Sequence, residues 1–350
     1  SQLILEYTLH RTCVGGNKGI QKDLDDGIDT IGKKMTVCQL YAKQIRHRRN
    51  VRYNTKNGRK RLMKLLEEDK LGGCPIDSVK LSDAKEWAIR MKEKEISYKT
   101  ISNDKRSLKA AFYTAIQDDC IRKNPFDFQL NTVIEDDTEP KVPLTPAQEE
   151  SFLSFAQNDK VYQKYYDELI ILLGTGLRIS ELCGLTDTDI DFENRIINVD
   201  HQLLRSAETG YYIETPKTKS GIRQIPMSEK VYEAFNRVLK RRRDAKAVTI
   251  DGYSNFLFLN RDGYPKTATN YDGMFRGLAK KYNKYHEEAL PKAMTPHTLR
   301  HTFCTNMANA GMNPKALQYI MGHSNITMTL NYYAHATFDS AKAEMLRIAA

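Results

Sequence analysis

Residues 295–302 read TPHTLRHT, and this stretch combines residues suited to two different kinds of site. His297 and His301 are four residues apart, and Arg300 follows His297 by three. On an α-helix these separations place the three side chains on one face. Two histidines at this spacing could hold a zinc ion, whereas a histidine and an arginine could bind a phosphate group. The rest of the chain decides between a metal site and an anion site.

The surrounding residues argue against a metal. A helical zinc protease site has the pattern H-E-x-x-H, with the glutamate as general base, but a threonine follows His297. A third ligand would have to come from His201, His323 or His335, and Arg300 would place a positive charge beside the ion. The six cysteines include no C-x-x-C pair, which argues against a zinc ribbon or a disulfide framework. We therefore expect no metal and no other cofactor.

The composition favours a nucleic-acid partner. The chain has 350 residues, with 54 Lys and Arg against 44 Asp and Glu, and a formal charge of +10. Such a balance is typical of proteins that bind a polyanion. No apolar run approaches the roughly 18 residues of a membrane span, and no signal peptide is visible. We expect a cytoplasmic protein that does not enter a membrane.

The periodicity of the apolar residues predicts a mainly α-helical chain with two folded domains. Residues 35–130 show helical patterns in about four successive segments, and residues 145–336 show a second, larger set. The intervening residues 131–144 are polar and acidic and contain two prolines, which is typical of a linker. We interpret residues 1–34 as the tail of a small N-terminal module, and residues 337–350 as a short amphipathic helix.

The second domain contains one predicted β region. The segments RIINVD (195–200) and YYIETPKTKSGIRQIPM (211–227) alternate apolar and polar residues as strands do. TKSG (218–221) is expected to form the turn of a β-hairpin, which would place Lys219 at its tip.

Basic residues of the first helical domain gather at helix starts and turns. A solvated charged face is the ordinary explanation for such runs, but at these positions they could also contact a DNA backbone. The residues that we expect to bind DNA are Arg46, Arg48, Arg49, Lys56, Arg59, Lys60, Lys99 and Lys105.

Basic and titratable side chains also form an ordered set along the second domain. Its members are Arg178, Lys219, His297, Arg300, His323, Tyr332 and Tyr333. Each has an ordinary structural explanation: Arg178, for example, follows a Gly-Thr-Gly break in an apolar helix and could simply pair with Glu181 or Asp187.

Together, these residues match the demands of phosphodiester cleavage. The transition state spreads negative charge over two non-bridging oxygens, which two arginines and one or two histidines can bind. A tyrosine hydroxyl can act as nucleophile, and a lysine can protonate the leaving 5′-oxygen. No metal or ATP is required, because the bond energy is kept in a phosphotyrosine ester.

The set resembles the tyrosine recombinase, or phage-type integrase, family. The sequence around it is most similar to that of integrases of conjugative transposons. The segments that carry the resemblance are TGLRISEL (175–182), KTKSGIRQIP (217–226), TPHTLRHTFCT (295–305), QYIMGH (318–323) and NYYAH (331–335). The family implies a core-binding domain at 35–130 and a catalytic domain at 145–336, which form a C-shaped clamp around DNA. Residues 1–34 would end a module that binds arm-type DNA sites.

The resemblance also implies a role for each residue of the set. Arg178 and Arg300 would bind the scissile phosphate. His297 would hydrogen-bond the phosphate and assist proton transfer at the tyrosine, and His323 would complete the anion site. Asp187 lies where the family often has an acid that supports these residues.

Two of the implied roles leave alternatives open. Lys219 would be the general acid, with Lys217 as the alternative because the length of the hairpin varies. Tyr332 would be the nucleophile by its spacing from the second histidine, whereas a Y-x-H ending selects Tyr333, followed by His335.

The implied partners are double-stranded DNA and further copies of the chain. Four protomers would act on two duplexes, the helix at 337–350 would dock on a neighbouring protomer, and an accessory DNA-bending or excision factor could set direction. The chain would work in a bacterial cytoplasm, near the nucleoid. Two alternative functions are a nicking-closing enzyme similar to type IB topoisomerases and an architectural DNA-binding protein without catalysis.

Overall fold

The structure is a computed structural model that describes residues 32–48, 51–139, 142–216, 218–241, 248–291, 294–333 and 345–346. The chain divides into two compact units, Ser1–Glu139 (unit 1) and Pro140–Ala350 (unit 2). Each unit has its own hydrophobic core. Most of the predicted N-terminal module and of the C-terminal helix lie outside the described residues, as do Arg49 and Lys217.

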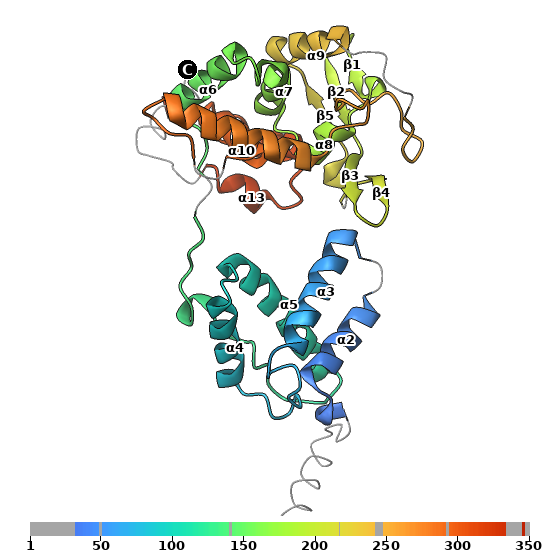
Figure 1. Cartoon of the computed structure of the whole chain (residues 1–350), viewed down its shortest axis with the longest axis vertical. Helices are drawn as coiled ribbons and strands as arrows, with labels where there is room; N and C mark the ends of the chain where they lie inside the picture. The colour runs from blue at the N-terminus through green and yellow to red at the C-terminus, as the bar shows by residue number, and fades with distance from the viewer. Residues whose placement is uncertain are drawn as a thin grey trace, which may run out of the picture. The chain divides into compact units, whose positions relative to one another are not determined.

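Unit 1 is helical, as the periodicity predicts (Figure 1). Its elements are η1 (Gly32–Lys34), α2 (Val37–His47), α3 (Tyr53–Glu67), α4 (Leu81–Glu93), α5 (Tyr98–Gln117) and η2 (Leu130–Thr132). The Thr36 side chain accepts a hydrogen bond from the Gln39 backbone, and the Gln39 side chain accepts one from the Thr36 backbone, which caps α2. Leu130 and Ile134 are buried in the core of unit 1, so the first residues of the predicted linker belong to this unit.

Unit 2 combines helices with two small antiparallel sheets, which lie on one side of the unit (Figure 1). Its helical elements are α6 (Pro146–Asn158), η3 (Gln163–Tyr165), α7 (Tyr166–Thr175), α8 (Ile179–Gly184), η4 (Asp187–Asp189), η5 (Lys219–Gly221), α9 (Glu229–Arg241), α10 (Ala268–Tyr285), α11 (Pro296–Asn309), α12 (Pro314–Met321) and α13 (Ile326–Leu330). Its strands are β1 (Ile190–Asp191), β2 (Ile196–Val199), β3 (Gln202–Ser206), β4 (Gly210–Glu214) and β5 (Arg223–Pro226). The apolar α7 packs against α9 and α11. The mainly α fold with a small β region is confirmed.

The predicted β-hairpin is wrong in its pairing. β4 pairs with β3, whereas β5 pairs with β2 in a separate sheet of order β1-β2-β5. Thr218–Gly221 is therefore not a hairpin turn but part of the connection between the two sheets, and Lys219–Gly221 forms the short helix η5. The alternating pattern correctly indicated strands, but strand pairing depends on contacts that a local pattern does not contain.

Two glycines end helices that lead into the candidate site. Gly176 (φ 63°) follows α7, and Gly322 (φ 61°) follows α12, both in the left-handed conformation that other residues adopt at a cost. A Cβ atom on Gly176 would lie 2.4 Å from the Phe303 ring, and one on Gly322 would lie 3.0 Å from the Ser220 carbonyl oxygen. Conformation and space together therefore require glycine at both helix ends.

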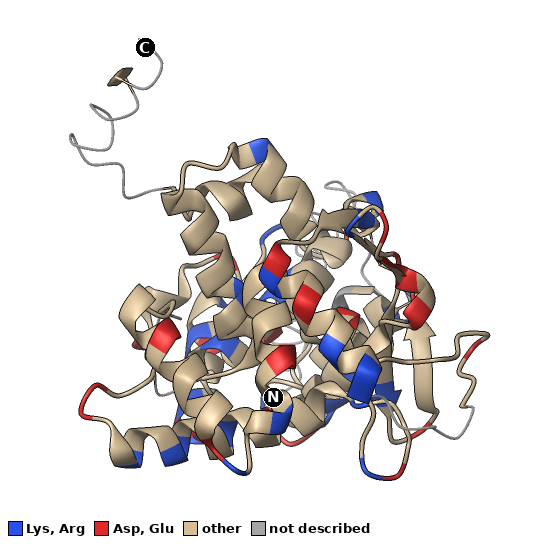
Figure 2. Ribbon diagram, turned by 90° about the horizontal axis from the view of Figure 1, so that it is seen from above, with Lys and Arg blue, Asp and Glu red and all other residues tan. Residues whose placement is uncertain are grey.

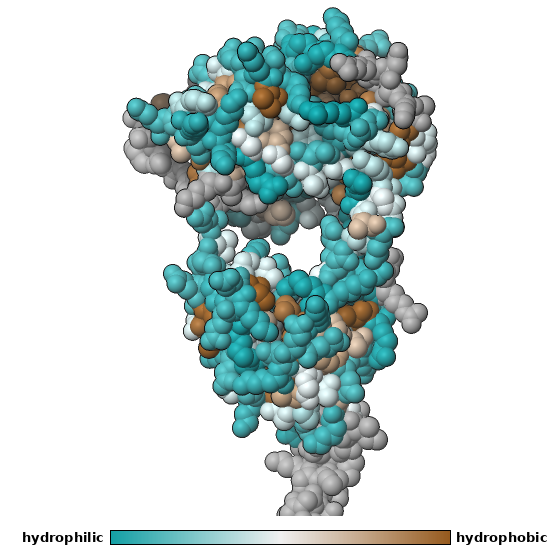
Figure 3. Space-filling view, viewed as in Figure 1, coloured by the Kyte–Doolittle hydropathy of each residue, from teal (hydrophilic) through white to brown (hydrophobic). Residues whose placement is uncertain are grey.

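In the view of Figure 2, basic segments occur on many elements and alternate with acidic ones. The face of the molecule seen in Figure 3 is mostly hydrophilic. In Figure 3 the hydrophobic patches on the visible face are small and separate. No helix among the described residues is both long and apolar enough to cross a membrane.

The core of unit 1 provides a test of the fold, because adjacent residues of α5 differ in burial. The Phe112 ring is fully buried, with its centroid 5.4 Å from that of Phe126, whereas Tyr113 is 43% exposed. Phe112→Ala should lower the free energy of unfolding by about 3–5 kcal/mol, because it leaves a cavity. Tyr113→Ala, the matched control, should cost less than about 1 kcal/mol. Denaturant unfolding would measure both, and equal losses would contradict the assigned packing.

Candidate active site

Three arginines from different elements meet at the C-terminal end of α12. Arg178 precedes α8, Arg223 lies on β5, and Arg300 lies in the second turn of α11. They bind three consecutive backbone carbonyls. Nε of Arg223 donates to Ile320 O at 2.6 Å, Nη2 of Arg300 donates to Met321 O, and Nη2 of Arg178 donates to Gly322 O at 3.0 Å.

The end of α12 is suited to hold cations. The last carbonyls of a helix have no partner within the helix and carry the negative end of its dipole. Arg300 makes a second contact of this kind, because its Nη1 donates to the carbonyl of Gly176, just after α7, at 2.5 Å. The two helix ends thus fix the guanidinium of Arg300 in the protein interior, where only 4% of the residue is exposed.

Glu181 is the acid that joins two of the arginines. Its Oε1 accepts from Nη1 of Arg178 at 2.6 Å and from Nη1 of Arg223 at 3.1 Å. Its Oε2 accepts from the Arg178 backbone at 2.8 Å and from Nη2 of Arg223 at 2.9 Å. The hydrogen bonds from Arg223 and its positive charge outweigh burial and lower the pKa of Glu181 to about 2, so this carboxylate is ionised at neutral pH.

The supporting role predicted for Asp187 stays a prediction, because the hydrogen bonds above join the arginines to a different acid. The carboxylate that bonds Arg178 and Arg223 belongs to Glu181, three residues after Arg178 on the same turn of chain. Asp187 lies in η4, where its backbone N–H donates to the Asn255 carbonyl. The sequence suggested Glu181 only as an ordinary ion-pair partner of Arg178, and this ion pair is present.

The arginine cluster keeps an excess of positive charge. Arg178, Arg223 and Arg300 carry three positive charges, and Glu181 provides one negative charge. Burial and the neighbouring Arg178 lower the pKa of Arg300 to about 9, so its guanidinium stays protonated at neutral pH. The side chain of Arg178 is 38% exposed, whereas that of Arg223 is fully buried. An anion can reach the cluster on the side of Arg178.

Two predicted histidines lie near the cluster in different environments. His323 directly follows the helix-ending Gly322, is buried, and faces the Thr329 hydroxyl with its Nδ1 at 3.0 Å. Burial and the charge of Arg300 lower the pKa of His323 to about 4, so its ring is neutral at neutral pH. His297 is exposed in the first turn of α11, and its charge contributes to the low pKa of His323.

The two tyrosines make different contacts. The Tyr333 hydroxyl donates to the Met312 carbonyl at 2.5 Å. Tyr332 places its ring edge against His301, with 4.9 Å between the centroids. Burial raises the pKa of the Tyr332 hydroxyl, and the positive charge of Arg300 opposes that rise. Of the two hydroxyls, the one on Tyr332 is therefore the one that the charge of the arginine cluster influences.

Lys219 lies on a segment that touches this site. The carbonyl of Gly221, at the end of η5, accepts a hydrogen bond from Arg223 at 3.1 Å, and the Ser220 carbonyl lies close to Gly322. The Lys219 side chain is exposed. The connection between the sheets, rather than a hairpin tip, thus brings the backbone of this lysine next to the end of α12.

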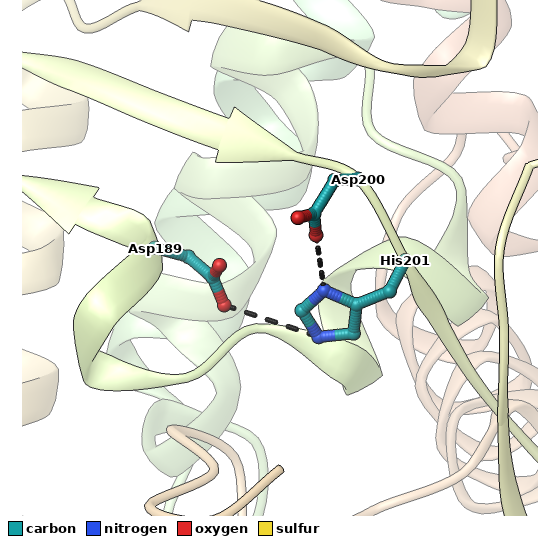
Figure 4. Close-up of side chains that lie close together, drawn as sticks. All are labelled: Asp189, Asp200 and His201. Atoms are coloured by element: carbon teal, nitrogen blue, oxygen red, sulfur yellow. Dashed lines mark hydrogen bonds and ion pairs between the residues drawn. The ribbon is translucent and has the colours of Figure 1, made fainter. Parts of the chain in front are cut away.

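A group of possible metal ligands elsewhere in unit 2 does not fit a metal site. The side chains of Asp189 and Asp200 point towards the His201 ring (Figure 4), and their ligand atoms lie within 4.8 Å of one another. Both ring nitrogens face acceptors, Nδ1 the Asp200 carboxylate at 2.6 Å and Nε2 the Gly184 carbonyl at 2.7 Å. A ring nitrogen that donates a hydrogen bond has no lone pair for a metal. In TPHTLRHT, His301 packs on Tyr332, so the zinc interpretation gains no support there either.

The basic residues predicted to bind DNA in unit 1 have different surroundings. Arg46, Arg48, Lys56, Lys60 and Lys99 are exposed. Nη1 of Arg59 donates to the Arg48 carbonyl at 2.9 Å. Nζ of Lys105 donates to the Phe128 carbonyl at 2.5 Å and lies over the Phe128 ring. Lys105 therefore joins α5 to the segment before η2, which the sequence did not indicate.

Arg223 is the residue of the arginine cluster that the sequence analysis missed. A signal was present: in the strand RQIP the alternation places residues 223 and 225 on the buried face, and an arginine there needs a buried partner. The signal could not be used without knowing which face of β5 is buried.

Comparisons with known proteins show the family to which this chain belongs. Residues 143–340 match the family model described as the phage integrase family. The transposase from transposon Tn916 of Enterococcus faecalis is 69% identical over 329 residues, which cover 94% of this chain and 81% of the relative.

Two solved structures of the Tn1549 transposon integrase are similar over nearly their whole length. One is a complex with a circular intermediate DNA, and the other is a complex with transposon right end DNA. Each is 77% identical to this chain with a TM-score of 0.86, and the match covers 90% of this chain and 99% or 100% of the solved chain. The chain belongs to the phage integrase family.

Proposed function

We propose that this tyrosine recombinase uses Tyr332 as nucleophile and Arg178, Arg300 and His323 as the site of the scissile phosphate, for excision and integration of a conjugative transposon. The observation that carries the proposal is the arginine cluster at the end of α12, with the Tyr332 hydroxyl within the influence of Arg300. An excess of fixed positive charge beside a tyrosine is what phosphoryl transfer to a hydroxyl requires.

The proposed reaction conserves atoms and phosphodiester bonds. Oη of Tyr332 attacks the scissile phosphorus, so a 3′-phosphotyrosyl bond forms while the bond to the 5′-oxygen breaks. The tyrosine proton passes to His297, and the leaving 5′-oxygen takes a proton from Lys219, for which Lys217 is the alternative. Attack by a 5′-hydroxyl of the partner strand reverses these steps and releases the tyrosine. No residue of this scheme requires a metal or a nucleotide.

The choice of Tyr332 over Tyr333 has a second support. The Tn1549 integrase complexes carry an arginine-to-lysine change in one structure and a tyrosine-to-phenylalanine change in another, and the changed positions are 154 residues apart. Arg178 and Tyr332 are also 154 residues apart, whereas Tyr333 is one residue further on. Experimenters commonly change reactive residues to trap complexes, so the matching separation favours Tyr332.

The enzyme binds DNA, and the relatives indicate which DNA. The Tn1549 integrase was solved with a circular intermediate and with a transposon end. We take the same two kinds of duplex as the substrates here, with unit 1 as the core-binding domain. Its exposed basic residues on α2 and α3 and at the start of α5 would contact phosphates.

The assembly that we propose is a tetramer on two duplexes, joined by the C-terminal segment. Met345 and Leu346 expose apolar side chains, and so do Met328 and Leu330 of α13. Docking of residues 337–350 on a neighbouring protomer would cover such surfaces, and a cyclic arrangement would cover all of them.

The nucleophile can be identified by trapping. Tyr332→Phe should abolish the covalent protein–DNA complex on a nicked duplex, because the attacking hydroxyl is removed. Tyr333→Phe, which loses only a hydrogen bond to the Met312 carbonyl, should still form the complex. Denaturing gel electrophoresis of labelled DNA measures both, and mass spectrometry locates the linked residue. A complex that survives in both single variants would refute the assignment and the mechanism with it.

His323 should make the folded state sensitive to acid. Its pKa falls from 6.5 to about 4 on folding, so below pH 6.5 the unfolded chain binds a proton that the folded chain does not. The free energy of unfolding should therefore fall between pH 6.5 and 4, by up to about 1.4 kcal/mol per pH unit from this residue. His323→Gln should remove that slope, as urea unfolding at several pH values would show. An unchanged slope would mean that His323 is not buried in its neutral form.

Removal of the C-terminal segment tests the assembly. A chain that ends at Ala336 should bind a single element end with unchanged affinity but form fewer tetramers, since the proposed contact between protomers is lost. Mass photometry of the DNA complexes and a strand-exchange assay would report the two effects. Normal tetramers together with normal strand exchange would refute docking between protomers.

A further inference from the structure

Arg223 is a buried arginine for which the proposed reaction has no direct use. In β5 the side chains of Arg223 and Ile225 face the core, while Gln224 and Pro226 face outwards. The side chain of Arg223 is fully buried. An inward strand position normally takes an apolar residue, and a buried charge is tolerated only when its partners are well placed.

Almost all side-chain N–H groups of Arg223 donate to acceptors within the protein. Nε donates to the Ile320 carbonyl, Nη1 donates to Glu181 and to the Gly221 carbonyl, and Nη2 donates to the second oxygen of Glu181. These bonds use four of the five N–H groups of a guanidinium. Arg223 therefore cannot bind the scissile phosphate itself.

The other two arginines differ from Arg223 in this respect. Within the part of the chain that the structure describes, Arg178 and Arg300 each use two side-chain N–H groups for protein acceptors. Each keeps three N–H groups for an anion. The acceptors that hold Arg178 and Arg300 include Glu181 and the end of α12, and Arg223 is bonded to both of these.

We propose that Arg223 is a positioning residue, which fixes Glu181 and the C-terminal end of α12 so that Arg178 and Arg300 meet the scissile phosphate in the right place. This inference rests on the proposed function. Without Arg223, the carboxylate of Glu181 would close on Arg178 alone and neutralise the one arginine of the cluster that is partly exposed. The carbonyl of Ile320 would also lose its partner, and α12 would lose its link to β5.

A lysine cannot replace Arg223 in this role. The two parallel bonds from Nη1 and Nη2 to the two oxygens of Glu181 need the planar fork of arginine, and Nε must reach Ile320 at the same time. An ammonium group keeps the charge but makes bonds from a single atom. Arg223→Lys thus separates charge compensation, which it retains, from positioning, which it loses.

The test is single-turnover cleavage by the full chain of a nicked duplex that carries the element's right end. Complexes are formed before the reaction is started, so that the rate refers to folded, DNA-bound enzyme. Arg223→Lys and Arg223→Met should bind the duplex within about threefold of the unchanged chain but form the phosphotyrosyl bond about 100-fold more slowly. The matched control is Arg237→Met, which removes an arginine of α9 in the same unit whose side chain bonds the buried Asp167 and Glu233 rather than the residues of the cluster. It should cleave at the normal rate.

A second substrate distinguishes positioning from a general structural defect. A methylphosphonate at the scissile position removes the negative charge of one non-bridging oxygen, so correct placement of the arginines matters less. The defect of the Arg223 variants should shrink from about 100-fold to about 10-fold or less on this substrate. A structural defect would slow both substrates by the same factor.

Several results would overturn the inference. They are cleavage by Arg223→Lys at the normal rate, an equal defect in Arg237→Met, an equal defect on both substrates, or loss of DNA binding by both Arg223 variants, which would make Arg223 a folding residue only. The proposed function fails separately, if the unchanged chain forms no phosphotyrosyl bond or if Tyr332→Phe still forms one.

Discussion

The end of α12 is the feature on which the site depends. Three consecutive carbonyls, at Ile320, Met321 and Gly322, each accept a hydrogen bond from a different arginine. These arginines come from β5, from α11 and from the residue before α8, so one helix end holds together three parts of the chain that are far apart in sequence. The arrangement requires α12 to stop abruptly. Gly322 provides this stop, because only glycine fits both the left-handed backbone and the close approach of Ser220.

The same helix end explains how like charges can be concentrated in a protein interior. Three guanidinium groups would repel one another, and burial would add a desolvation cost. Helix-end carbonyls offset much of this cost without adding a full negative charge, and Glu181 supplies one carboxylate. Full neutralisation by acids would have removed the attraction for a phosphate. The dipoles of the helix-end carbonyls stabilise the arginines and leave their attraction for a phosphate in place. The same positive charge helps to keep His323 neutral.

Local signals account for the parts of the structure that were predictable from sequence. The helices of both units follow from apolar periodicity, and the caps at Thr36 and Thr145 follow from side chains that bond nearby backbone groups. Pairing of β4 with β3 was not predictable, because it depends on which strand lies beside which in space. Arg223 was missed for a related reason, since its importance follows from the buried face of β5 and from contacts with residues 42 and 97 positions away.

Two neighbouring residues can also make different contacts that the sequence does not predict. The spacing from the second histidine favours Tyr332, whereas the Y-x-H ending favours Tyr333. The course of the chain after α13 directs the Tyr333 hydroxyl to the Met312 carbonyl and brings Tyr332 against His301. His301 follows Arg300 directly, so the ring that supports Tyr332 and the guanidinium that opposes the rise in the pKa of its hydroxyl belong to one turn of α11.

The unused donors of the arginines indicate that the site is formed before DNA arrives. Within the described residues, protein acceptors occupy two of the five side-chain N–H groups on each of Arg178 and Arg300. A phosphate can therefore bind to the remaining groups without breaking the bonds that hold these side chains in place. Charge stabilisation is most effective when donors need not reorganise during the reaction. The helix end and Glu181 offset the repulsion and desolvation of the arginines when the protein folds. This free energy therefore need not be supplied in each catalytic cycle.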